Sequence, residues 1–179
     1  MDVFWEQGYE AASLSMLLAA MGIAKGSLYK VFPDKHAVYL ATLDRYDRGH
    51  IRPGIMMLRD GTQGSGGQRL RAALLAPADA IHNGGQRRGC FLCNAAIDMA
   101  PKDAAVAEIV RSMMDRLEAG FQSAFDDSGA TAGLTASQCR AAGRMLVTTY
   151  MGLHVMAKAG YSSRRLTAIA QSALSTLGL

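Results

Sequence analysis

A short segment near the start of the chain carries the side chains best suited to contact a polyanion. Within residues 24–32, helical spacing leaves small, basic and hydroxyl-bearing residues on one free face: Lys25, Gly26, Ser27, Tyr29 and Lys30. Small residues permit close approach, lysines neutralise phosphates, and hydroxyls donate to phosphates or base edges. We therefore expect this face to enter a groove of double-stranded DNA.

The flanking residues predict the helices that must hold this face. Ser13 is placed as an N-cap. The apolar residues that follow at i, i+3, i+4 and i+7, which predict a helix ending at Gly22, are Leu14, Leu17, Leu18 and Met21. Pro33 ends the second, short helix, and Asp34 caps a third that we expect to reach about His50. We take Ser13 as a further phosphate contact.

Lys35 lies in the first turn of that third helix, where a cation opposes the helix dipole. A phosphate partner would account for this position, and the alternative is a freely solvated side chain. Lys35 therefore joins the candidate DNA contacts.

Cys90 and Cys93 form a second candidate site, a Cys-x-x-Cys pair. We expect no metal, because zinc needs two more ligands at a matching spacing, and no thioredoxin-like activity, because the sequence lacks a βαβ pattern. Cys90 follows Arg87 and Arg88 at a predicted helix start, two features that lower a thiol pKa. The pair is thus either a redox or electrophile sensor or inert core.

The remaining pattern predicts helices and loops without useful β-alternation. We expect an interruption at residues 52–54, a flexible Gly-rich linker at 60–67, and helices over about 68–83 and 104–125. A hairpin of two amphipathic helices, 136–159 and 163–177, closes the chain and can pack on a copy of itself. Thr135 and Gln138 are spaced as a capping box at the start of the first of these helices. His154, on the same helix, could face a pocket, although a satisfied core or interface histidine is expected.

The order of motifs in the first part of the sequence resembles the DNA-binding domain of TetR family regulators. The matching residues are Gly8-Tyr9, Ser13, Gly22-Ile23, Gly26-Ser27-Leu28-Tyr29, Phe32 and Asp34-Lys35. The Gly89-Cys90 block and the Ala100-Pro101-Lys102-Asp103 run resemble the C-terminal domain of one branch of that family. In the family the first helix is longer and often begins with basic residues, and its first part is not in this sequence.

The resemblance implies an all-α fold in two parts: a helix-turn-helix head at 1–50, and a ligand-binding and dimerisation domain at 51–179. It implies a homodimer joined through the last two helices, and a repressor released from a palindromic operator by a small molecule or electrophile. Alternatives are a small-molecule-binding dimer that lacks DNA binding and a thiol-based redox sensor. No catalytic set stands out, so we expect neither an enzyme nor a cofactor.

Composition limits these hypotheses. The formal net charge is +4, but residues 1–50 hold five lysines and arginines against six carboxylates, so DNA binding must depend on where the lysines lie. No apolar run approaches the about 18 residues of a membrane span, and no signal-peptide core is recognised. We therefore expect a cytoplasmic protein, in which three cysteines do not form a disulfide framework.

Overall fold

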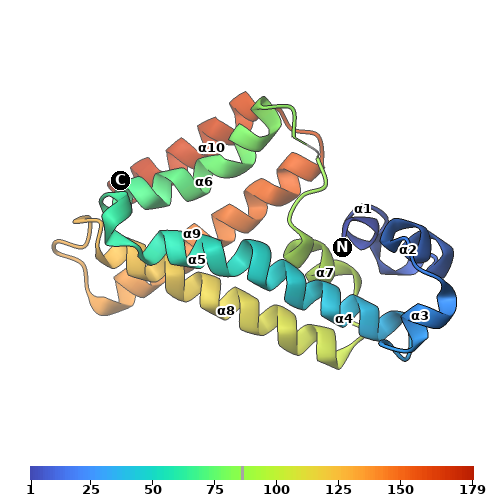
Figure 1. Cartoon of the computed structure of the whole chain (residues 1–179). Helices are drawn as coiled ribbons and strands as arrows, with labels where there is room; N and C mark the ends of the chain where they lie inside the picture. The colour runs from blue at the N-terminus through green and yellow to red at the C-terminus, as the bar shows by residue number, and fades with distance from the viewer. Residues whose placement is uncertain (86) are drawn as a thin grey trace.

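The computed structural model describes residues 1–85 and 87–179, and it is built from helices (Figure 1). No β-strand occurs in these two stretches, which confirms the predicted all-α class. The first helices are α1 (Asp2–Ala11), α2 (Leu14–Met21), α3 (Lys25–Tyr29) and α4 (Lys35–Tyr46). They are followed by α5 (Arg52–Arg59), α6 (Gly66–His82), α7 (Phe91–Asp98), α8 (Ala104–Asp126), α9 (Ala136–Lys158) and α10 (Ser163–Thr176).

Helices α1 to α3 and the start of α4 form a small head around buried apolar side chains. Leu17 of α2 and Leu28 of α3 are almost fully buried and anchor these short helices against α1 and α4. Ser13 caps α2 by accepting a hydrogen bond from the backbone N–H of Met16. Gly22 ends α2 with φ of +65°, a left-handed conformation that suits glycine. The predicted caps and turn are thus confirmed.

A continuous helical rod leads from the head into the body, contrary to the predicted interruption at residues 52–54. One π-helical turn, η1 (Asp47–Ile51), joins α4 directly to α5. Pro53 has no N–H to donate and follows directly on this π-helical turn, so the change in hydrogen-bond pattern lies next to the proline. In Figure 1 this rod runs from the head alongside α8.

The Gly-rich segment at 60–67 is more ordered than its composition predicted. Asp60 accepts hydrogen bonds from Thr62 in a 3₁₀ turn, η2 (Gly61–Gln63). Ser65 and Gln68 then form a reciprocal capping box, so α6 begins at Gly66 rather than at about residue 68. The linker prediction was wrong because local capping outweighs glycine freedom.

The body is a bundle in which α8 packs against α9 and α5, and α10 packs against α6 (Figure 1). Buried residues at helical spacing supply its core, including Phe121, Phe125, Leu146 and Leu166. The predicted capping box of Thr135 and Gln138 opens α9. None of the described helices is both long enough and apolar enough to cross a membrane.

Aromatic side chains join the head to the body. Phe4 meets Tyr39 edge-on, with ring centroids 5.1 Å apart, and Trp5 meets Tyr46 in the same way at 5.0 Å. Phe91, the first residue of α7, packs against both tyrosines. Edge-to-face contacts of this kind fix orientation as well as burying area, so α1, α4 and α7 are positioned as one unit.

Candidate nucleic-acid interface and adjoining cavity

The free face of α3 has the composition that the sequence predicts for a DNA contact. Leu28 is 1% exposed and holds α3 on the head, while Lys25, Ser27 and Lys30 are exposed and Tyr29 is 44% exposed. A Cβ atom placed on Gly26 would meet nothing within 4 Å, so a partner could approach the backbone there. The Lys25 ammonium lies 5.9 Å from the Tyr29 ring centroid, which brings a cation and a phenol together.

Ser13 and Lys35 are occupied within the head. The Ser13 hydroxyl oxygen lies 3.2 Å from the Met16 nitrogen and 2.8 Å from the Ser15 hydroxyl. The Lys35 ammonium donates to the Glu10 carbonyl at 3.3 Å and lies 4.5 Å from the centroid of the Tyr9 ring. These contacts give an internal reason for the cation in the first turn of α4.

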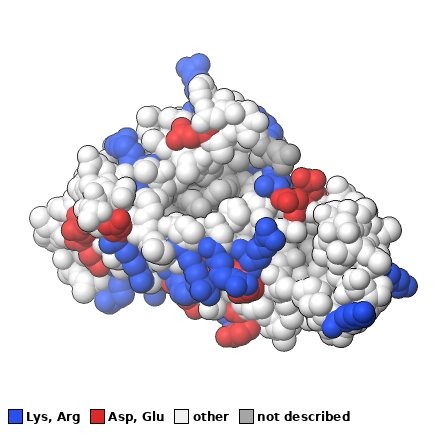
Figure 2. All heavy atoms as spheres, in the orientation of Figure 1, with Lys and Arg blue, Asp and Glu red and all other residues white. Residues whose placement is uncertain are grey.

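Basic side chains do not concentrate on the head. In Figure 2 they gather below the central hollow of the molecule, whereas the head shows few charges in this view. This distribution agrees with the charge count of residues 1–50. DNA contact by this chain would therefore depend on the few lysines of α3 and its surroundings.

Cys90 and Cys93 lie at the start of α7, as predicted, and both are buried free thiols. Hydrogen bonding from Cys93 and from the Tyr46 hydroxyl, 3.2 Å away, lowers the pKa of Cys90, although burial opposes this. The Cys93 thiol also lies 3.3 Å from the Met151 sulfur, and its one proton serves a single acceptor at a time. Hydrogen bonding of the Cys93 thiol to Cys90, together with burial, raises the pKa of Cys93.

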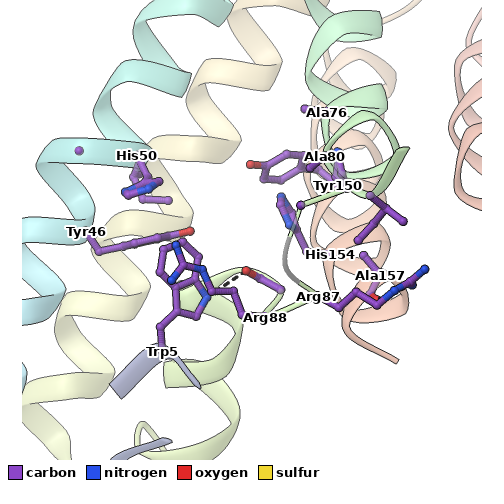
Figure 3. A pocket seen from close by; sticks show the side chains of 16 residues that line it. Trp5, Tyr46, His50, Ala76, Ala80, Arg87, Arg88, Tyr150, His154 and Ala157 are labelled. Carbon is purple, nitrogen blue, oxygen red and sulfur yellow. Dashed lines mark hydrogen bonds between the residues drawn. The ribbon is translucent and has the colours of Figure 1, made fainter. Parts of the chain in front are cut away.

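A cavity of about 590 Å³ opens between the head and the body. Trp5 of α1 and Tyr46 of α4 line one side, Tyr150 and His154 of α9 line the other, and part of α6 covers it (Figure 3). Figure 2 shows the same region as a hollow in the surface.

His154 lines this cavity, and its buried Nε2 has no hydrogen-bond partner among the described residues, so the structure shows no satisfied core position for it. Burial lowers the pKa of His154 to about 4. Trp5 also lines this cavity, and the sequence alone does not indicate that role. The one feature that sets Trp5 apart is that it is the chain's single tryptophan.

A three-helix head that presents a short, solvent-facing helix, carried on a helical body, defines the class of helix-turn-helix regulators. Residues 1–42 match the family model described as bacterial regulatory proteins, tetR family, and residues 66–173 match the tetracyclin repressor-like C-terminal domain. The chain therefore belongs to the TetR family, which confirms the resemblance seen in the sequence.

Two curated relatives and one solved structure illustrate the similarity. The chain is 30% identical over 120 residues to the uncharacterized HTH-type transcriptional regulator YezE of Bacillus subtilis (strain 168), covering 67% of this chain and 61% of YezE. It is 30% identical over 113 residues to the HTH-type transcriptional repressor ComR of Escherichia coli (strain K12), covering 63% of this chain and 53% of ComR. A cysteine mutant of the TetR family transcriptional regulator CifR, solved with 26bp double-strand operator DNA, is 28% identical, with a TM-score of 0.82 over 97% of this chain and 91% of CifR.

Proposed function

We propose that this protein is an effector-responsive, sequence-specific DNA-binding transcriptional regulator that acts as a repressor. The observation that carries the proposal is the exposed face of α3, with Lys25, Ser27, Tyr29 and Lys30 around an open Gly26. The similarity to CifR, which was solved on operator DNA, and to the repressor ComR supports it. Such a regulator works where the DNA is, so we place it in the cytoplasm.

We further propose that residues 1–50 form the reading head, and that 51–179 bind the effector and form a homodimer. The predicted dimer helices, α9 and α10, support this with a free stripe on α9. Met145 and Val155 are 40% and 45% exposed, and a Cβ on Gly152 would meet nothing within 4 Å, which leaves room for a second copy. Two heads related by a twofold axis would read successive major grooves of a near-palindromic operator.

The lysines of α3 provide the test. We would titrate a labelled mixed-sequence duplex with the chain over a range of salt concentrations, and compare Lys25→Ala/Lys30→Ala with the unaltered protein. The log–log salt slope should fall by about 0.9 for each phosphate that the variant no longer neutralises. Arg140→Ala, an exposed cation on α9, is the control and should keep the slope. An equal slope in the double variant would remove these lysines from the interface.

Lys35 needs a separate variant because it already bonds within the head. Lys35→Met removes the charge but keeps an apolar stem near Tyr9, so a change in salt slope would report a phosphate contact rather than altered packing. An unchanged slope would assign Lys35 to the head alone.

A second candidate function, thiol-based sensing, is favoured by the surroundings of Cys90. Its pKa is lowered by hydrogen bonding from Cys93 and Tyr46, and both cysteines line a small cavity of about 210 Å³. A thiolate there could attack hydrogen peroxide, breaking the O–O bond to give a sulfenic acid and hydroxide, which takes up a proton to become water. The Cys93 thiol could then condense with that sulfenic acid to a disulfide, releasing a second water.

We expect peroxide to release the chain from DNA, and Cys90→Ser to abolish that release. Cys139→Ser removes the third, half-buried cysteine and should respond like the unaltered chain. Release that persists in Cys90→Ser would locate the sensor elsewhere. Binding of small molecules with no DNA binding in any condition would instead favour the alternative of a ligand-binding dimer.

A further inference from the structure

The cavity between head and body has one wall made of flat rings. Trp5 and Tyr46 meet edge-on, the His50 ring stacks on Tyr46 with centroids 4.6 Å apart, and His50 lies edge-on to Trp5 at 5.3 Å. The three rings come from α1, α4 and η1, so this wall belongs to the head and to the start of the rod. Its rings pack against one another and present a mostly apolar aromatic surface to the cavity.

The opposite wall belongs to α9 and carries neutral hydrogen-bonding groups. Tyr150 and His154 lie edge-on, with centroids 4.7 Å apart. Figure 3 shows the Tyr150 hydroxyl directed across the cavity toward His50. The His154 Nε2 is buried without a partner in the described part of the chain. An unpaired buried nitrogen is costly, and a bound hydroxyl or carbonyl group would remove that cost once the His154 ring turns to bring Nε2 to the cavity surface.

The charges around the cavity do not suit a cation. Its described lining contains no aspartate or glutamate, and burial lowers the pKa of both His50 and His154, so both rings are neutral near pH 7. Arg87 donates to the carbonyls of Ala157 and Tyr161, and the Arg88 guanidinium lies 3.9 Å from the Trp5 ring centroid. Asp2 and Glu6 pair with Arg88 at 2.7 and 3.8 Å. A cationic ligand would therefore find no free carboxylate in the described lining, and an anionic one would have to displace the present partners of the arginines.

The cavity is large enough for a ligand of several rings. Its volume of about 590 Å³ falls within the usual range for small-molecule sites, about 300–1,000 Å³. Ala76, Pro77 and Ala80 of α6 give it an aliphatic cover, which excludes water from one side of a bound ring. The lining therefore combines an apolar slot with a few convergent polar groups.

We propose that this cavity binds an uncharged, planar aromatic molecule carrying a hydroxyl or carbonyl group, held between the Trp5–Tyr46 wall and the Tyr150–His154 wall. The inference rests on the proposed effector-responsive function and specifies the chemistry of its effector. The occupant would touch α1 of the head and α9 of the body at once. Its affinity would therefore depend on how the head sits on the body, which is the condition for it to shift that arrangement.

The test uses three probes that share one ring system and differ in charge: 2-naphthol, 2-naphthoate and 2-naphthylmethylammonium. Binding to the full chain without DNA is measured by isothermal titration calorimetry at pH 7.5. We expect 2-naphthol to bind at least about tenfold more tightly than either charged probe, a difference of about 1.4 kcal/mol. Absent 2-naphthol binding, or equal or tighter binding of the ammonium or of 2-naphthoate, would overturn the proposal.

Two variants locate the probe within the cavity. Tyr150→Phe and His154→Phe each remove a polar group and keep a ring, and each should weaken 2-naphthol binding by about fivefold, the worth of one neutral hydrogen bond. Tyr161→Phe alters a tyrosine outside the cavity and should bind like the unaltered chain. If both cavity variants bind 2-naphthol with the affinity and stoichiometry of the unaltered chain, the site lies elsewhere and the proposal fails.

Measuring the binding of the same chain to duplex DNA separates the cavity assignment from the proposed DNA-binding function. If 2-naphthol binds as expected but the chain shows no affinity for any duplex, the DNA-binding function fails while the cavity assignment stands. If the chain binds DNA and 2-naphthol does not bind the chain, the cavity assignment fails alone.

Discussion

His154 shows how one side chain can be unfavourable for stability and suited to binding. Burial lowers its pKa from 6.5 to about 4, and its Nε2 has no partner among the described residues. Evolution of a stable core alone would favour an apolar ring here, because burying an unpaired nitrogen costs free energy. The position is therefore better explained by the cavity than by packing.

The pH dependence of stability follows from the same shift. Between about pH 6.5 and 4 the unfolded chain binds a proton at His154 that the folded chain does not, so the free energy of unfolding falls as pH falls. Above that range His154 contributes no slope. Its share is at most about 1.4 kcal/mol per pH unit. We expect His154→Phe to flatten the pH dependence measured by urea unfolding.

His82→Phe serves as the control for this measurement, because His82 is exposed at the end of α6. It should keep the slope of the unaltered chain. Identical slopes in His154→Phe and the unaltered chain would mean that His154 titrates alike in both states, contrary to its burial.

At the scale of elements, the first turn of α6 packs directly against the backbone at the end of α8. A Cβ on Gly66 would overlap the carbonyl oxygen of Ala124 and lie 2.7 Å from the carbonyl carbon of Asp127. A Cβ on the neighbouring Gly67 would make an ordinary contact, 3.4 Å from Leu179. Only Gly66 therefore lies where a side chain would clash, although the two glycines are neighbours in the sequence.

We expect Gly66→Ala to lower the free energy of unfolding by about 1–3 kcal/mol, the usual cost of overpacking, because backbone must move. Gly67→Ala should leave it unchanged or raise it by up to about 1 kcal/mol, since alanine has less freedom to lose. Urea unfolding at one fixed protein concentration measures both. Equal effects of the two substitutions would contradict the packing of α6 against the end of α8.

These glycines also show what the sequence could not supply. Local signals were sufficient where capping is local, as for Ser13, Asp34 and Thr135, and the structure confirms each. They failed at residues 52–54, where the helix continues from a π-helical turn in spite of the proline. They also failed at residues 60–67, where a capping box orders the Gly-rich segment.

The two candidate sites, the α3 face and the cavity, also differ in how well the sequence predicts them. The α3 face follows from spacing within one short segment, so the sequence could predict which side chains share it. The cavity brings together α1, α4, α6 and α9, and nothing in the spacing of Trp5 and Tyr150 indicates that they face each other. Only the packing of head against body assembles that wall.

At the scale of the whole molecule, several contacts tie the head to the body. Trp5 donates its indole N–H to the Gly89 carbonyl at 3.0 Å, Arg88 pairs with Asp2 at 2.7 Å, and His36 meets Asp103 at 2.6 Å. Trp5 and Arg88 also line the cavity. An occupant there would act directly on the contacts that hold α1, which links the proposed effector to the spacing of two heads.

The proposed dimer would set that spacing, and a substitution at Val155 on α9 tests the dimer. Val155→Glu would bury an unpaired carboxylate between copies, and we expect the dimer to weaken at least about tenfold in light-scattering measurements. Met56→Glu places the same charge on α5, at a side chain that is 70% exposed, and should leave the dimer intact. A dimer equally tight in both variants would move the interface away from this stripe.

The proposed function depends above all on a symmetric pair of α3 faces that reads DNA sequence. The most direct measurement is selection of bound duplexes from a random pool at moderate salt, over several rounds, followed by sequencing. We expect a near-palindrome to emerge, with half-sites spaced by whole helical turns. Loss of enrichment in Lys25→Ala/Lys30→Ala would assign that selection to α3. Failure of the unaltered chain to enrich any sequence, or enrichment of a single asymmetric site, would contradict symmetric reading by α3.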